Sequence, residues 1–128
     1  MVRWNRIRKY MPTEKQSLAQ SFWNAFRGIK HELRERNFVI QIMIGIAVIA
    51  LSLGLDVPEG DKMILLILIA FVLVGEIINS ACERILNLVT RDHNAEVARI
   101  KDMLAGSVLI YSATAFVIGI WIFGNALR

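Results

Sequence analysis

The sequence predicts an all-α integral membrane protein, with an N-terminal amphipathic surface helix followed by three transmembrane helices. Hydrophobic residues make up 55% of the 128-residue chain, and the mean hydropathy is +0.50, both above what a soluble domain needs to fill its core. Three apolar runs are each long enough to cross the ~30 Å of hydrocarbon in a bilayer. The segments before and between these runs hold most of the charged residues. We therefore expect one membrane-embedded domain over residues 1–128.

The first element is a surface helix over residues 13–35, preceded by a flexible tail over residues 1–12. Thr13 and Gln16 have the spacing of a capping box, which marks a helix start. Apolar residues then recur at helical spacing and form one face: Leu18, Phe22, Phe26, Ile29 and Leu33. Polar and basic residues occupy the opposite face. This pattern is typical of a helix that lies in the membrane interface. An ordinary helix packed on its own protein would give the same pattern.

The three spans are predicted over residues 36–55, 63–89 and 98–124. The first is apolar from Phe38 onward apart from Gln41 and Ser52. A short acidic segment containing Pro and Gly separates it from the second span, so the chain reverses there. A polar connection over residues 90–95 is expected to cap the third span.

The distribution of basic residues predicts the orientation in the membrane. Nine of the fifteen Lys and Arg residues lie before Asn37, and the first loop has a single Lys among three acids. The positive-inside rule then puts the N-terminus in the cytoplasm and the C-terminus outside. A basic tail can also bind nucleic acid, but beside membrane spans it favours anionic lipid headgroups, so we expect no nucleic-acid partner. Cys82 is the only cysteine, which excludes an intrachain disulfide.

Polar side chains interrupt the apolar pattern in the last part of the second span. Because a helix advances about 100° per residue, four of them fall within roughly 80° of one another on one stripe: Glu76, Asn79, Glu83 and Asn87. Ionisable groups at membrane depth are costly to bury, and they mark functional sites by default.

The predicted topology brings ionisable residues from three helices to one depth. At 1.5 Å per residue, Glu83 reaches the cytoplasmic boundary and Glu76 lies roughly 10 Å deeper. Glu35 lies just before the first span, and Lys101 and Asp102 begin the third, so all three reach that same boundary. Carboxylates suit a hard divalent cation, a Lys suits phosphate, and a recessed carboxylate can accept a proton. The cluster therefore favours an anionic substrate with a divalent metal.

Three motifs resemble those of the small bacterial diacylglycerol kinase and undecaprenol kinase family. They are Glu76-Ile-Ile-Asn79-Ser80-Ala81-Cys-Glu83, then Lys101-Asp102-Met-Leu-Ala105-Gly106, and Glu35-Arg36-Asn37-Phe38 ahead of the first span. The last of these is most similar to the undecaprenol kinase branch. The resemblance covers roughly residues 21–120 in the same order and spacing. One position departs from the family pattern, because Asn87 stands where the family usually has Asp.

The resemblance implies a homotrimer in the bacterial inner (cytoplasmic) membrane, with active sites shared between subunits. It implies transfer of the γ-phosphoryl group of ATP, with Mg²⁺, to a membrane lipid alcohol. Carried over by motif position, Glu76 is the catalytic base, Glu35 and Glu83 hold metal, and Glu76 with Ser80 meets the lipid substrate. The nucleotide and its phosphates are assigned to Asn79, Asn87, Lys101 and Asp102. The absence of a Gly-rich phosphate loop from the sequence is consistent with this family.

The residues leave two alternatives open. The acceptor can be undecaprenol or diacylglycerol, and Glu35-Arg36-Asn37-Phe38 favours undecaprenol. The other alternative is a non-catalytic small membrane protein, such as an assembly subunit or an ion or proton path. In that case Glu76 and Glu83 serve transport, or pair with Lys101 or Arg84 to hold helices together.

Overall fold

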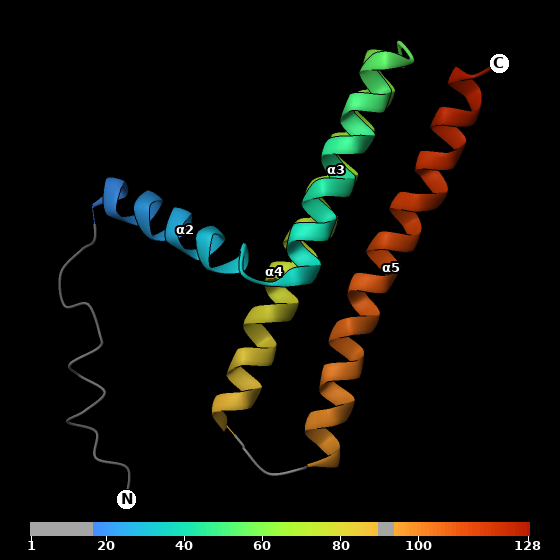
Figure 1. The fold of residues 1–128 in the computed structure, drawn as a ribbon. Helices are drawn as coiled ribbons and strands as arrows, with labels where there is room; N and C mark the ends of the chain where they lie inside the picture. Colours follow the sequence, from blue (N-terminus) through green and yellow to red (C-terminus); the bar gives the residue numbers. More distant parts are fainter. Residues whose placement is uncertain (1–16, 90–93) are drawn as a thin grey trace, which may run out of the picture. The chain divides into compact units, whose positions relative to one another are not determined.

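The computed structural model describes residues 17–89 and 94–128, which form helices α2 (Leu18–Glu32), α3 (Arg36–Gly54), α4 (Glu59–Val89) and α5 (Ala95–Ala126) (Figure 1). No strand occurs among these residues. Helices α3, α4 and α5 are each long and apolar enough to cross a membrane, so the predicted all-α membrane fold is confirmed. By its internal contacts the chain divides into two units, Met1–His31 and Glu32–Arg128.

Helix α2 begins at a capping box formed by Ser17 and Gln20. The Ser17 backbone N–H donates to Gln20 Oε1 at 3.0 Å, and the Gln20 N–H donates to Ser17 Oγ at 3.2 Å. This reciprocal pair satisfies two N–H groups that a helix start otherwise leaves without partners. The expected capping pair Thr13 and Gln16 lies outside the described residues. The apolar side chains of α2 are exposed, from 82% for Leu18 to 47% for Ile29, which is consistent with the predicted helix in the membrane interface.

Helix α3 ends in a Schellman motif. The Val57 N–H donates to Ser52 O at 3.1 Å, and the Asp56 N–H donates to Leu53 O at 3.4 Å. This motif needs a left-handed residue directly after the helix, and Asp56 supplies it with a φ of 47°. Val57 is then buried against Leu65 and Ile122. The turn therefore anchors the end of α3 to the other two spans.

Helix α4 starts four residues before the predicted second span. Glu59, Gly60, Asp61 and Lys62 belong to its first turn, where acidic side chains favour the positive end of the helix dipole. Its 31 residues correspond to about 46 Å, so the helix is longer than the hydrocarbon layer. Helix α5 is capped by Asn94, whose side chain accepts from the Glu96 N–H at 2.8 Å. The polar connection thus caps the third span as expected.

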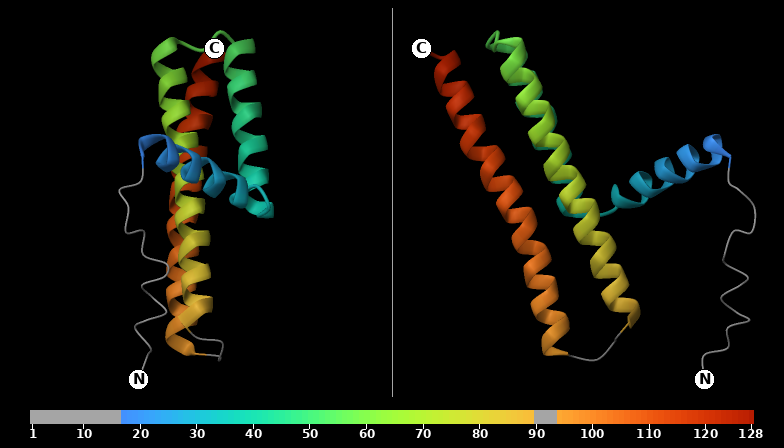
Figure 2. Two further views of the ribbon diagram at one scale, coloured as in Figure 1. Left: turned by 90° about the vertical axis from the view of Figure 1, so that its left-hand side faces the viewer. Right: turned by 180° about the vertical axis from the view of Figure 1, so that it is seen from behind.

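Helix α4 is the central element of the second unit, because it packs against both α3 and α5 (Figure 2). Two glycines permit these contacts. A Cβ added at Gly45 would lie 2.9 Å from Ile69 Cγ2, and one added at Gly75 would lie 2.8 Å from Tyr111 Cδ2. Small residues at such crossings let membrane helices approach closely.

Burial in this fold is unlike that of a soluble domain. The buried side chains include the polar residues Glu32, Ser52, Glu76 and Ser80 as well as a few apolar ones. Large apolar side chains on the spans are exposed, as a surface that faces lipid requires. Among the described residues, the interior therefore contains functional candidates rather than only packing residues.

Candidate active site

Glu76 lies in the interior of the second unit and has a partner on another helix. Its exposed fraction is 5%, and Gln41 Nε2 on α3 donates to its Oε2 at 3.3 Å. The other carboxylate oxygen, Oε1, accepts no hydrogen bond from a described residue. Hydrogen-bond donors stabilise a buried carboxylate, and Gln41 supplies one. The contact leaves Oε1 as the carboxylate oxygen of Glu76 without a hydrogen bond from the described residues.

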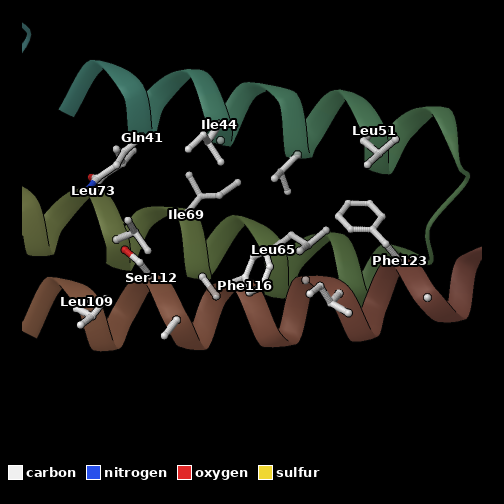
Figure 3. Close-up of a pocket in the computed structure, with 18 of the residues that line it drawn as sticks. Gln41, Ile44, Leu51, Leu65, Ile69, Leu73, Leu109, Ser112, Phe116 and Phe123 are labelled. Atoms are coloured by element: carbon white, nitrogen blue, oxygen red, sulfur yellow. The ribbon is translucent and has the colours of Figure 1, made fainter. Parts of the chain in front are cut away.

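A long apolar groove begins at Gln41. Its volume is about 830 Å³, and it is lined by α3, α4 and α5 from the level of Gln41 and Leu73 to that of Leu51 and Phe123 (Figure 3). Gln41 and Ser112 are the polar side chains among its lining residues. A groove of this chemistry suits a hydrocarbon chain. The Gln41 end of the groove lies beside the Glu76 carboxylate. A ligand with an apolar chain in the groove would therefore have its polar group close to Glu76.

Two further polar residues follow Glu76 on α4. Asn79 has a buried side-chain oxygen, Oδ1, with no hydrogen-bond partner among the described residues. Ser80 is 9% exposed and lies on the same buried face as Glu76. A buried acceptor without a donor is destabilising, so Asn79 has capacity for a ligand.

Lys101 and Asn87 are brought together from α5 and α4. Lys101 Nζ donates to Asn87 Oδ1 at 2.9 Å. An amide oxygen holds the ammonium group in position without neutralising its charge, whereas a carboxylate would form an ion pair. The positive charge of Lys101 thus remains available to an anion. Asp102 is exposed, and its side chain forms no hydrogen bond or ion pair in the described part of the chain.

Glu35 contacts α4 through Arg84 rather than through Glu83. Arg84 Nη2 lies 2.9 Å from Glu35 Oε1 and 3.5 Å from Glu32 Oε2. Glu83 is the residue before Arg84, is half-buried, and forms no ion pair within the described ranges. The sequence alternative in which Arg84 or Lys101 pairs with Glu76 or Glu83 is therefore not observed. These two cations contact Glu32, Glu35 and Asn87 instead.

Within residues 17–89 and 94–128, no group of three or more His, Cys, Asp or Glu side chains could hold a metal ion. A Mg²⁺ site does not need three, because Mg²⁺ commonly binds one or two carboxylates and completes its shell with water and substrate phosphates. Glu35 fits such a site, since its carboxylate already contacts a positive group and makes no helix-capping hydrogen bond. Glu32 Oε1, buried without a partner close by, is a second oxygen of the required kind.

These observations define a helical, multi-span membrane protein with a buried carboxylate at one end of an apolar groove. The chain belongs to the prokaryotic diacylglycerol kinase family, whose model matches residues 23–123. The undecaprenol kinase of Bacillus subtilis is 31% identical over 105 residues, which cover 81% of this chain and 85% of that protein. The diacylglycerol kinase of Synechocystis sp. is 30% identical over 105 residues, covering 80% and 60%. The resemblance found in the sequence is confirmed, and the protein is a lipid kinase.

Sequence reasoning assigned no role to Gln41 or Glu32, and it considered Arg84 only as an ion-pair partner of Glu76 or Glu83. Gln41 had a visible signal, because it is one of two polar residues in an otherwise apolar span. Glu32 and Arg84 had none, since a charged residue near the end of a span is ordinary. Their significance comes only from their contact with Glu35.

Proposed function

We propose that this lipid kinase transfers the γ-phosphoryl group of ATP to the hydroxyl of a membrane lipid alcohol, with undecaprenol as the preferred acceptor and diacylglycerol as the alternative. The observation that carries the proposal is the buried Glu76 carboxylate beside the polar end of the apolar groove. The undecaprenol preference is supported by Glu35-Arg36-Asn37-Phe38 and by the relative that matches over most of its own length.

In the proposed reaction, Glu76 acts as the general base. Oε1 accepts the proton of the lipid hydroxyl while Gln41 holds Oε2. The alcohol oxygen forms a bond to the γ-phosphorus, and the bond from that phosphorus to the β–γ bridging oxygen breaks. ADP leaves with the electron pair of that bond. The lipid tail remains in the groove, which excludes water as a competing acceptor.

The nucleotide side of the site is assigned to the polar residues nearer the end of α4. Lys101, held by Asn87 at 2.9 Å, would place a positive charge on the phosphates. Asn79 and Asp102 would orient the nucleotide, and Ser80 would lie beside the acceptor. Glu35 and Glu83 would hold Mg²⁺, which neutralises triphosphate charge when bound.

We also propose that the protein assembles as a homotrimer in the bacterial inner membrane, with its N-terminus in the cytoplasm. The charge distribution supports the orientation. The homotrimer, with a site shared between its subunits, is what the resemblance to the kinase family implies. Cross-linking in native membranes followed by mass measurement tests the assembly.

A lipid phosphorylation assay tests the function. Purified protein in detergent micelles is given ATP labelled at the γ-phosphate, Mg²⁺, and either undecaprenol or diacylglycerol. Glu76→Gln keeps the shape of the side chain but removes the base, so turnover is expected to fall at least about 100-fold. Binding of a fluorescent ATP analogue should stay unchanged.

Glu59→Gln is the matched control, because Glu59 is an exposed acid in the first turn of α4. It should keep wild-type turnover with both lipids. Full activity of Glu76→Gln would remove the proposed base. Phosphorylation of neither lipid by the wild-type protein would contradict the proposed acceptors.

A further inference from the structure

One arginine contacts two acidic side chains at the junction between α2 and α3. Arg84 Nη2 on α4 lies 2.9 Å from Glu35 Oε1 and 3.5 Å from Glu32 Oε2. One oxygen of each carboxylate therefore faces the same positively charged nitrogen. With one guanidinium and two carboxylates, the group has a formal charge of −1.

Glu32 is the unusual member of this group. Its side chain is 6% exposed, and its Oε1 is buried with no hydrogen-bond partner in the described part of the chain. A buried carboxylate oxygen without a donor or cation carries a desolvation cost that the fold does not recover. Native proteins keep such a group where it has a ligand or a function. Glu32 Oε1 is thus an acceptor without a partner, on the carboxylate that also contacts the guanidinium group of Arg84.

We infer that Glu32 and Glu35 together form a divalent-cation site, in which Arg84 is an exchangeable counter-ion. The inference rests on the proposed function for the metal-binding role of Glu35 and Glu83, and it adds Glu32 to these two ligands. A cation with oxygen ligands at 2.0–2.1 Å, as Mg²⁺ requires, is reached from the present distances by carboxylate movements of about 1–1.5 Å. Glu32 and Glu35 leave several coordination positions for Glu83, for water and for the phosphates of the nucleotide.

The side chain of Arg84 can leave this position without unfolding the helix that carries it. It is 48% exposed, and a long, partly solvated guanidinium can rotate into water at small cost. When a cation replaces it, both carboxylates keep a positive partner and Glu32 Oε1 gains one. Arg84 therefore satisfies the acids in the absence of metal and competes with metal for them.

Mn²⁺ binding provides a direct test that does not depend on turnover. Binding is followed by the loss of the free Mn²⁺ signal in electron paramagnetic resonance, on purified protein without nucleotide. Glu32→Gln should weaken binding by about tenfold or more, because it removes the charge of one ligand. Arg84→Gln should tighten binding by about twofold to fivefold, because it removes the competing cation.

The Arg84→Gln result separates this inference from a purely structural ion pair. A structural role predicts a less stable protein with unchanged or weaker Mn²⁺ binding, and a misfolded variant would not bind more tightly. Arg99→Gln is the matched control, since Arg99 is an exposed arginine paired with Glu96 on α5, and it should leave binding unchanged. Equal binding by wild-type and Glu32→Gln, no saturable binding by the wild type, or no gain in Arg84→Gln would overturn the inference.

The lipid assay distinguishes this failure from a failure of the proposed function. Loss of Mn²⁺ binding in Glu32→Gln, with no lipid phosphorylation by the wild type, would support the cation site and contradict the proposed acceptors. Phosphorylation of undecaprenol by the wild type, with Mn²⁺ binding unaffected by Glu32→Gln, would contradict the cation site alone.

Discussion

The contact between Gln41 and Glu76 leads to the most specific prediction for catalysis. Gln41→Met keeps the length and approximate volume of the side chain but removes the amide that donates to Glu76 Oε2 at 3.3 Å. No other hydrogen bond to Glu76 is found from the described residues. The carboxylate would then be buried without a donor and free to rotate, so the proposed base would lose its fixed orientation.

The size of the effect follows from the strength of the lost hydrogen bond. Hydrogen bonds to charged groups contribute about 1.5–3 kcal/mol, and the 3.3 Å separation is longer than the distances usual for charge-assisted bonds. We therefore take the lower value, about 1.5 kcal/mol, which corresponds to roughly a tenfold change in rate. The turnover number should fall by about this factor. The KM for ATP should stay unchanged, because Gln41 lies at the groove rather than beside Lys101.

The measurement is steady-state lipid phosphorylation with ATP and acceptor varied separately. Ser112→Ala is the control, since Ser112 lines the same groove but donates no hydrogen bond to Glu76. It should keep the wild-type turnover number. Combining Gln41→Met with Glu76→Gln should cost no more than Glu76→Gln alone, because Gln41 acts through that carboxylate. A turnover number within twofold of wild type for Gln41→Met would refute the positioning role.

Two further substitutions test the contacts between α4 and α5. Asn87→Asp adds a carboxylate beside the Lys101 ammonium group. The new ion pair competes with phosphate for Lys101, so the KM for ATP should rise by up to about fivefold. An unchanged or lower KM would contradict this prediction. Gly75→Ala places a methyl group 2.8 Å from the Tyr111 ring and should destabilise the protein by about 1–3 kcal/mol. Thermal unfolding in detergent measures this, with Gly54→Ala, which meets no atom within 4 Å, as the control that keeps the melting temperature.

The sequence by itself determined the class of the fold, and it predicted which residues take part in the chemistry. Apolar runs of sufficient length predict three spans because the bilayer core has a fixed thickness. Helical periodicity put Glu76 and Glu83 on one stripe because the rotation per residue is constant. Both arguments use only local geometry. The start of α4 at Glu59 was less predictable, because a charged, polar segment can either form the first turn of a helix or belong to the preceding loop.

Only the tertiary structure decided which side chains are partners. Gln41 and Glu76 are 35 positions apart, Glu35 and Arg84 are 49 apart, and Asn87 and Lys101 are 14 apart. Each pair depends on how one helix is rotated and shifted against another, and that arrangement is set by close approaches such as Gly45 to Ile69. The periodicity of a single helix contains no information on its rotation relative to a neighbour. Packing across helices therefore gave Glu76 its donor and assigned Arg84 to Glu32 and Glu35.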